Sequence, residues 1–368
     1  MLKIFKVKNY KNFKDELILD FSDKKDYKFN QYAVKNNMIN TMVIYGKNAT
    51  GKSNLGLAIF DITLHLVDKQ QINDQINNYL NADSVEGYAS FSYTFDFNGE
   101  IITYSYKKTA AKSLLYEELF INGNKIFAYN FKNSKIDKGD LELIGAQDYN
   151  YKFPKNDKSI LRYISAFPGQ EQNKYIGCLM KFVNNMLWFR SVQDRSYIGF
   201  KSGTDFIMEK IIKAGYVNKF DKFLKKAGMD YKLSVGKDAT GKESLLSNHE
   251  NRPLSFWEIA SSGTRSLTLY FYWSMGFEKA SFLFVDEFDA FYHYELAQSI
   301  LEDISSKAKV QVIFTTHNTT LLNNDILRPD CYYIINNSKL TSLPKLTERE
   351  LREAHNLEKL FKQGEFVG

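Results

Sequence analysis

The chain has 368 residues, which allows about two domains with a sizeable core. Apolar residues make up 44% of it, charged residues 25% and aromatic residues 15%, and this usage excludes a chain that is disordered throughout. Its 49 Lys and Arg against 43 Asp and Glu leave a net charge of +6, a mild basic bias that permits nucleic-acid binding without indicating it.

The cysteines and the start of the chain predict a soluble, cytoplasmic protein. Cys178 and Cys331 stand far apart with no CxxC or His/Cys cluster nearby, so neither a disulfide framework nor a structural zinc site is supported. Lysines interrupt the apolar residues of the opening MLKIFKVK, so no signal-peptide core forms there. The uncharged stretch 266–277 is too short to span a bilayer, and no membrane partner is expected.

The first part of the chain predicts strands that lead into a glycine loop. Apolar residues have strand spacing at 1–8 and 16–21, and TMVIYG at 41–46 is typical of a short buried strand. After Ser53, apolar residues recur at helical intervals. The predicted order is therefore strand, glycine loop, helix.

The middle of the chain changes in character twice. Residues 88–130 alternate aromatic and polar residues around Asn98-Gly99 and Asn122-Gly123, which predicts an antiparallel meander. Residues 159–227 are expected to be mostly helical, but no heptad pattern persists, so a long coiled coil is excluded. A hairpin is expected over 231–246.

The last part predicts a helix after Gly263 and two buried strands, FLFVDE at 282–287 and VQVIFTTH at 310–317. Alternating helices and apolar strands at both ends indicate one parallel sheet made from the two ends of the chain. The predicted fold class is α/β, a P-loop fold with an antiparallel β meander and a helical insertion. We expect three units: 1–87 with 245–368 as the nucleotide-binding head, 88–158 as a β subdomain, and 159–244 as a mostly helical insert that ends in a hairpin.

The clearest motif follows the first buried strand and matches GxxxxGK[ST]. Its glycines let the backbone turn N–H groups toward phosphate oxygens, Lys52 supplies a charge for the β and γ phosphates, and the Ser53 hydroxyl is suited to Mg²⁺. The predicted nucleotide-binding residues are Gly46, Lys47, Asn48, Ala49, Thr50, Gly51, Lys52, Ser53 and the following Asn54.

A second match to the same expression occurs at residues 236–243. Glu243 stands there in place of the hydroxyl, Asp238 adds negative charge within the loop, and the flanks are typical of hairpin strands. We therefore interpret this second match as a hairpin turn.

Two strand ends carry further candidates. Asp286 is predicted to hold Mg²⁺ through water, and Glu287 to act as general base on the attacking water. His317 ends the next apolar strand, where it could contact the γ-phosphate or orient the water. Each strand end alone is a weak signal, because acids and single histidines are common at such positions.

Residues 261–265, SSGTR, precede an apolar helix. Small hydroxyl residues with glycine at a helix N-terminus make an anion site, since free N–H groups and the helix dipole point there. An ordinary serine N-cap is the competing interpretation.

Together these motifs resemble ABC-type ATPases, of the RecF/SMC-like branch and of the bacterial anti-phage (abortive-infection) ATPases within it. The phosphate loop, SSGTRS, FLFVDE and TTH follow the family's order of Walker A, signature, Walker B and switch histidine, and KVKNYKNFKDE and AHNLEKLFKQGEFVG resemble its first and last segments. The resemblance covers roughly 1–67 and 255–368. Thr264 and Arg265 depart from the usual signature, and Tyr292-His293 from the usual D-loop. The Q-loop glutamine has three candidates, Gln170, Gln172 and Gln193.

The resemblance implies a function and its cofactors, ATP and Mg²⁺. It implies that Ser262 and Gly263 of one subunit cap the ATP bound by the other, in an ATP-dependent homodimer or a higher oligomer. The expected role is an ATPase that senses or regulates a separate effector, a nuclease or toxin, in anti-phage defence.

Two alternatives remain. One is a RecF-like DNA-repair ATPase that binds DNA directly, so nucleic acid stays open as a partner. The other is a nucleotide-gated scaffold with little hydrolysis.

Overall fold

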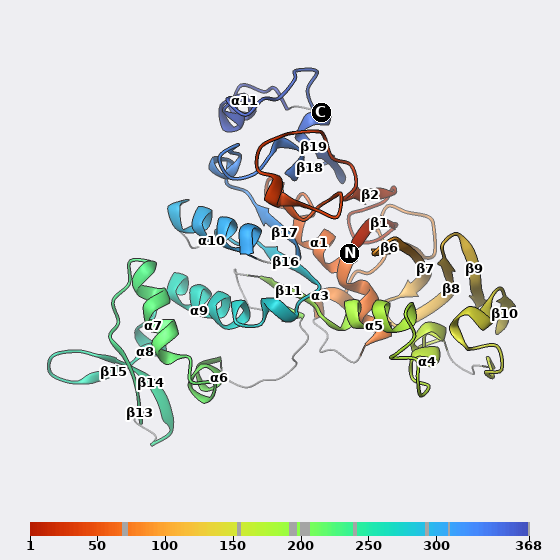
Figure 1. Ribbon diagram of the computed structural model, residues 1–368, viewed down its shortest axis with the longest axis horizontal. Coiled ribbons are helices and arrows are strands. Elements are labelled where there is room, and N and C mark those ends of the chain that lie inside the picture. Colours follow the sequence, from red (N-terminus) through yellow and green to blue (C-terminus); the bar gives the residue numbers. More distant parts are fainter. Residues whose placement is uncertain are drawn as a thin grey trace.

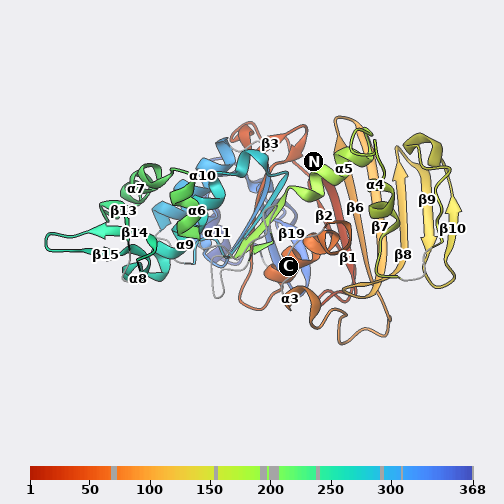
Figure 2. The same ribbon diagram turned by 90° about the horizontal axis from the view of Figure 1, so that it is seen from below.

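The computed structural model describes residues 1–67, 73–152, 156–190, 197–198, 207–237, 241–290, 294–307 and 310–366. Two large sheets and a smaller lobe spread out along the long axis of the molecule (Figure 1). The same arrangement is visible from below, with the antiparallel strands at one end and the lobe at the other (Figure 2).

An antiparallel sheet of seven strands, in the order β10-β9-β8-β7-β6-β1-β2, forms one end of the molecule. It confirms the predicted meander. Asn98-Gly99 and Asn122-Gly123 all have positive φ angles, as tight hairpin turns require. The strands are β1 (Leu2–Lys8), β2 (Leu17–Asp20), β6 (Ala89–Phe97), β7 (Glu100–Ala110), β8 (Ser113–Ile121), β9 (Asn124–Asn130) and β10 (Lys135–Lys138).

The two ends of this sheet come from different predicted units. β1 pairs with β6 from Leu2↔Phe95 to Lys8↔Ser90, so the strands at the start of the chain extend the meander. The predicted boundary between 87 and 88 therefore separates strands that share one hydrogen-bonded sheet. Hairpin signals in a sequence indicate pairing only between strands joined by a short turn. Because β1 and β6 lie about eighty residues apart in sequence, their pairing could not be predicted in this way.

A second sheet of seven strands has the order β12-β11-β16-β17-β5-β18-β19, and its five middle strands are parallel. Every residue of β5, β16 and β17 is buried, as expected for parallel strands that are covered on both faces. The strands are β5 (Thr41–Tyr45), β11 (Met186–Arg190), β12 (Tyr197–Ile198), β16 (Phe282–Asp286), β17 (Gln311–Thr316), β18 (Tyr332–Asn336) and β19 (Lys339–Ser342). Both ends of the chain build this sheet, as predicted.

One segment of the middle also enters this sheet, which corrects the expectation of a mostly helical stretch over 159–227. Met186–Arg190 forms β11 and pairs in parallel with β16, from Met186↔Phe282 to Arg190↔Asp286. A five-residue apolar run that follows a helix cannot be assigned by periodicity alone. The helix itself ends at Asn184, two residues before the strand.

Short helices connect the two sheets. The segment after β5 packs on both, because Gly56 lies against Phe284 and Trp188 of the parallel sheet, and the Tyr93 hydroxyl of the antiparallel sheet donates to the Ala58 carbonyl. These helices are α1 (Lys52–Ile59), α2 (Thr63–Leu66), α3 (Asn73–Ile76), α4 (Ile160–Ser165) and α5 (Ile176–Asn184).

A lobe at the opposite end of the molecule contains the predicted hairpin and the helix that follows Gly263. It consists of α6 (Ile207–Lys213), α7 (Val217–Lys226), β13 (Leu233–Lys237), β14 (Glu243–Asn248), β15 (Pro253–Ser255), α8 (Phe256–Ile259) and α9 (Ser262–Ser274). The remaining elements are β3 (Val34–Lys35), β4 (Met38–Ile39), α10 (Tyr294–Lys307) and α11 (Leu357–Lys362).

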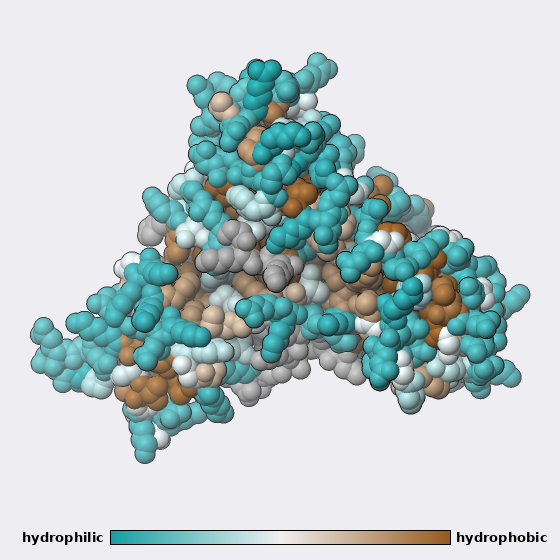
Figure 3. Space-filling view, viewed as in Figure 1, coloured by the Kyte–Doolittle hydropathy of each residue, from teal (hydrophilic) through white to brown (hydrophobic). Residues whose placement is uncertain are grey.

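The surface is mainly hydrophilic where the molecule projects into solvent, and hydrophobic residues show mostly in the recesses between the projections (Figure 3). Among the described residues, no helix has both the length and the apolar character needed to cross a membrane.

Candidate functional site

The glycine loop lies between β5 and α1, in the predicted order of strand, loop and helix. β5 ends at Tyr45 and α1 begins at Lys52. Ala49 (φ 64°) and Gly51 (φ 103°) adopt the left-handed region, which lets successive backbone N–H groups turn toward one concave side. At Gly46 there is no room for a side chain, because an added Cβ would lie 2.6 Å from Ile335 Cγ2. The left-handed residues thus lie in the loop for which the sequence predicts anion binding.

Lys52 is the cation of this loop, and its side chain is almost fully buried, with 4% of its surface exposed. Its Nζ donates to the carbonyl of Gly46 at 2.7 Å and to that of Lys47 at 3.0 Å. Burial lowers the pKa of the ammonium, and the nearby charges of Glu287, Asp286 and Asp289 act in the opposite direction. Asp286, at the end of β16, and the two acids that follow it therefore belong to the electrostatic surroundings of Lys52.

Asn12, which follows β1, fixes the loop from outside. Its Oδ1 accepts from Asn54 Nδ2 at 2.8 Å, and its Nδ2 donates to the Thr50 carbonyl at 3.4 Å. Ser338, at the β18–β19 turn, donates to the Asn12 carbonyl at 2.7 Å. Thr50 closes the loop internally by donating to the Lys47 carbonyl at 2.8 Å. Neither Asn12 nor Ser338 was predicted from the sequence as a site residue, although the opening segment that contains Asn12 is part of the resemblance to RecF/SMC-like ATPases.

A pocket of about 640 Å³ borders the loop on the side of Asn12 and Asn54. Most of its lining residues carry amide or carboxylate side chains, one is a lysine, and Leu57, Leu80 and Ala82 add apolar surface. The lining residues are Lys11, Asn12, Asn54, Leu57, Asp74, Asn77, Asn78, Leu80, Asn81, Ala82 and Asp83.

The two acids after FLFV differ in environment. Asp286 is fully buried, and its Oδ1 accepts from the Thr315 hydroxyl at 2.7 Å. Glu287 is only partly buried and has a left-handed φ of 48°, and its N–H donates to the same Thr315 oxygen at 2.8 Å. The hydroxyl of Ser53 and the carboxylate of Asp286 are hard oxygen donors, so this donor set fits Mg²⁺.

His317 is exposed at the end of β17, directly after two buried threonines. The neighbouring Thr316 hydroxyl donates to Asp289 Oδ2 at 2.8 Å. Asp289 is 7% exposed, its Oδ1 has no hydrogen-bond partner within the described ranges, and burial raises its pKa. Asp289 is a site residue that sequence reasoning missed, and its only signal was a third acid two residues after Glu287.

The signature residues lie elsewhere in the fold. Ser262 and Gly263 begin α9, and the Ser261 side chain caps this helix by accepting from the Thr264 N–H at 3.2 Å. Ser262 is exposed. Arg265 is turned back onto Trp257, with its Nη2 donating to the Trp257 carbonyl at 2.8 Å. Figure 1 places the start of α9 in the lobe with α6 to α8, whereas α1 lies at the central sheet, so one chain does not bring signature and phosphate loop together.

The structure describes only some of the remaining candidates. Gln170 is buried and donates to the Ile144 carbonyl at 2.8 Å, Gln172 is exposed, and Gln193 lies outside the described residues, as does Tyr292-His293. The second glycine-loop match falls on the β13–β14 hairpin, as interpreted from its flanks.

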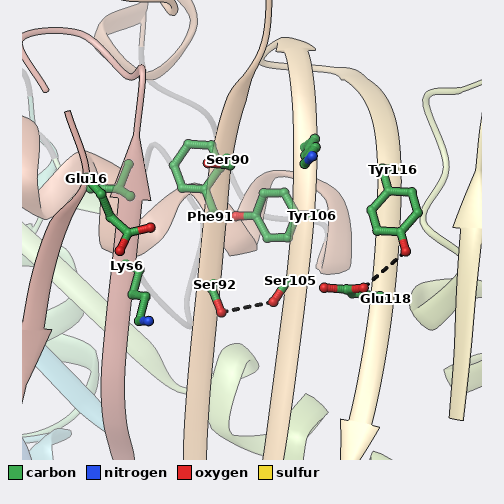
Figure 4. Close-up of a pocket in the computed structure, with 11 residues that line it drawn as sticks. Lys6, Glu16, Ser90, Phe91, Ser92, Ser105, Tyr106, Tyr116 and Glu118 are labelled. Atoms are coloured by element: carbon green, nitrogen blue, oxygen red, sulfur yellow. Dashed lines mark hydrogen bonds between the residues drawn. The ribbon is translucent and has the colours of Figure 1, made fainter. Parts of the chain in front are cut away.

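A shallow pocket of about 360 Å³ lies apart from the loop, on the outer face of the antiparallel sheet (Figure 4). Small serines on β6 and β7 form its floor, and the Ser105 hydroxyl donates to Ser92 at 2.9 Å. Lys6, Glu16 and Glu118 stand at its sides, so both charge signs are present. Within the described ranges, no group of three or more His, Cys, Asp or Glu side chains is arranged to hold a metal ion.

Comparison with solved structures found similarity to SMC head domains and to a recombination mediator protein. The SMC head domain from Thermotoga maritima is 17% identical, with 95% of this chain and 99% of that chain covered and a TM-score of 0.41. RecF bound to ATP, titled a recombination mediator protein of the RecFOR pathway, is 16% identical, with 93% and 99% covered and a TM-score of 0.40. An Smc head domain from Pyrococcus furiosus bound to the C-terminal domain of ScpA is 13% identical, with 99% and 98% covered and a TM-score of 0.40.

Comparison with curated proteins gave no match at the threshold applied. One protein-family model matches residues 42–323, which include the phosphate loop, the signature segment and both strand ends described above. This match confirms the predicted recognition as an ABC-type ATPase of the RecF/SMC-like branch, related to abortive-infection ATPases. The chain belongs to the family described as "AAA domain, putative AbiEii toxin, Type IV TA system".

Proposed function

We propose that the protein binds and hydrolyses ATP at the loop 46–53. The observation that carries this proposal is the position of the loop between β5 and α1, with the buried ammonium of Lys52 held inside it by the carbonyls of Gly46 and Lys47. The charges of Glu287, Asp286 and Asp289 also act on this ammonium and raise its pKa against the effect of burial, which suits a site that receives a divalent cation together with phosphates.

In this proposal each residue of the site has a separate role. The loop N–H groups and Lys52 bind the phosphates, and Ser53 and Asp286 hold Mg²⁺, which neutralises phosphate charge when bound. Glu287 accepts a proton from the attacking water, and its partial exposure gives that water access. His317 orients the γ-phosphate or the water. The amide-lined pocket beside Asn54 receives the base and ribose, whose polar edges match amide donors and acceptors.

Hydrolysis is proposed to require two copies of the chain. Ser262 is exposed at the start of a 13-residue helix, in a lobe separate from the phosphate loop. Its helix N-terminus is suited to the phosphates of a nucleotide bound by another copy. ATP then stabilises a two-fold dimer, because it contacts both subunits.

The biological role follows the family description, which names a toxin of a type IV toxin–antitoxin system. We propose a cytoplasmic ATPase that senses or regulates a separate effector in anti-phage defence, with the segment 88–230 as the surface that contacts it. The absence of a three-residue metal cluster within the described residues is consistent with a separate effector. A plain stabilising role for that segment is the alternative.

Two variants test the dimer. Glu287→Gln should retain ATP and accumulate a dimer, whereas Ser262→Arg should remain monomeric because the arginine fills the anion site. Thr109→Arg, on the exposed end of β7, is the matched control and should behave as the wild type. Light scattering with ATP and Mg²⁺ reports the mass, and the same assembly for Glu287→Gln and Ser262→Arg would contradict the trans arrangement.

Turnover with DNA decides between the remaining roles. A rate that rises with duplex DNA, and loses this stimulation as salt increases, would favour the RecF-like alternative. A wild-type dimer that forms with ATP but turns over no faster than Glu287→Gln would favour the scaffold.

A further inference from the structure

The parallel strands β16 and β17 end side by side, and each contributes two polar side chains there. The last paired residues are Val285 and Phe314, so Asp286 and Thr315 follow on neighbouring strands. Both side chains are fully buried. Two neighbouring threonines, Thr315 and Thr316, thus meet the acidic segment 286–289.

Thr315 joins the two acids of the Walker B strand through one oxygen atom. Its Oγ1 donates to Asp286 Oδ1 at 2.7 Å and accepts the N–H of Glu287 at 2.8 Å. A hydroxyl has a single proton, so its donor capacity is used entirely on Asp286. The position of one carboxylate and the backbone of the next residue are therefore set by the same atom.

Glu287 needs this support because its φ is 48°. The left-handed conformation is unfavourable for a residue with a side chain, and it persists only where surrounding contacts hold it. A continued strand would send Asp286 and Glu287 to opposite faces. The turn at Glu287 breaks that alternation, and both carboxylates act on the charge of Lys52.

Thr316 makes the equivalent contact one residue later. Its Oγ1 donates to Asp289 Oδ2 at 2.8 Å and accepts the N–H of Asn318 at 2.9 Å. The side chain of Asn318 also favours the charged carboxylate of Asp289, against the effect of burial, which raises the pKa of this carboxyl. His317 stands between these two anchored residues, so its backbone is fixed relative to the acidic segment.

We propose that Thr315 and Thr316 are positioning residues of the ATPase site: Thr315 holds Asp286 and Glu287 in their working directions, and Thr316 with Asp289 holds the turn that carries His317. This inference rests on the proposed function for its kinetic readout. It adds Thr315, Thr316 and Asp289 to the site, none of which touches the reacting atoms.

The test compares Thr315→Val with Thr315→Ser and with Thr41→Val. Valine removes the hydroxyl at nearly constant shape, and serine keeps it. Thr41, on the adjacent strand β5, is also fully buried, but its hydroxyl has no hydrogen-bond partner among the described residues, so Thr41→Val controls for the loss of a core hydroxyl.

For Thr315→Val we expect kcat to fall at least about 10-fold, with the Kd for ATP within about threefold of wild type. Thr315→Ser should recover kcat to within about threefold, and Thr41→Val should leave it unchanged. Unchanged kcat in Thr315→Val, no recovery with serine, or an equal loss in Thr41→Val would each overturn the positioning role.

Amide exchange at Glu287, followed by NMR, gives a readout that needs no turnover. Its N–H should exchange at least about 10-fold faster in Thr315→Val than in wild type or Thr315→Ser. Unchanged protection would overturn the inference at the level of geometry. If the Glu287 N–H is protected in the wild-type protein but this protein turns over no ATP at all, the proposed function is contradicted instead. The failure of the positioning role and the failure of the proposed function are therefore distinguishable.

Discussion

Two groups of buried acids differ in how their charge is compensated: one surrounds Asp61, between α1 and α2, and the other lies at the end of β16, in the segment 286–289. Asp61 accepts from Tyr106 at 2.9 Å, from Lys108 at 2.6 Å and from Tyr79 at 2.8 Å, and both members of its ion pair are fully buried. Asp289 accepts from one hydroxyl, and its other carboxylate oxygen has no partner in the part of the chain that the structure describes. We call the first group closed, because a cation and hydroxyl donors bind both oxygens of its carboxylate. We call the second group open, because one oxygen of Asp289 has no donor among the described residues.

Glu117 extends the closed group to α4. Its carboxylate accepts from the Ser159 hydroxyl at 2.7 Å and from the N–H groups of Ile160 at 2.8 Å and Leu161 at 2.9 Å. It thereby caps the helix from the neighbouring strand β8. Burial nonetheless raises its pKa. Asp61 and Glu117, the acids of the closed group, stabilise the junction between the antiparallel sheet and the helices. The acids of the open group, in the segment 286–289, remain able to interact with a ligand.

The largest effect should come from breaking the closed group. Asp61→Asn leaves the Lys108 ammonium buried without its counter-charge, and we expect a loss of about 3–5 kcal/mol in the free energy of unfolding. Denaturant titration measures it. Asp61→Asn combined with Lys108→Met should recover most of the loss, and a double variant as unstable as the single one would show that charge is not the cause.

Glu287→Gln should separate activity from stability in the open group. We expect turnover to fall about 100-fold or more, because the general base is lost. The free energy of unfolding should change by less than about 0.5 kcal/mol, since Glu287 is only partly buried. A stability loss as large as that of Asp61→Asn would contradict the distinction between the groups.

The smallest effect concerns pH and the buried His65. Burial lowers its pKa well below 6.5, with further lowering by Lys108 and Arg162. Below pH 6.5 the unfolded chain binds a proton that the folded chain does not, so stability is lost as the pH falls. The groups that face His65 are Tyr104, Tyr106, Lys108 and Arg162.

His65→Gln should remove this proton. The slope of unfolding free energy against pH below 6.5 should become shallower by up to about 1.4 kcal/mol per pH unit. Glu117 acts in the opposite sense, because its raised pKa costs stability as the pH rises above 4.5, but it is present in both proteins and cancels in the comparison. Identical slopes in the wild type and in His65→Gln would show that His65 does not contribute to the loss of stability at low pH.

The sequence predicted what depends on local pattern. The loop between β5 and α1, the buried strands that end at Asp286 and Thr316, and the helix after Gly263 all lie where their spacing indicated. Contacts between distant segments could not be predicted in this way. Thr315 and Thr316 look like ordinary strand residues until β17 is placed beside β16.

The sequence contains a weak signal of the closed group around Asp61. In β7, Tyr104, Tyr106 and Lys108 share the inward phase of the strand, so a lysine stands where the pattern demands a buried residue. A charge at an inward position requires a counter-charge. The partner, Asp61, lies 47 residues earlier, in a segment that read as a plain helical continuation.

Equilibrium binding of ATP with Mg²⁺ tests the central claim most directly. Lys52→Ala is compared with Lys112→Ala, which removes an exposed lysine at the β7–β8 turn, outside the loop, and serves as the matched control. We predict that the wild type and Lys112→Ala bind ATP with Kd values within about fivefold of each other. Lys52→Ala should lose at least about 100-fold, because the buried ammonium is the phosphate loop's own charge. Unchanged affinity in folded Lys52→Ala would contradict the account.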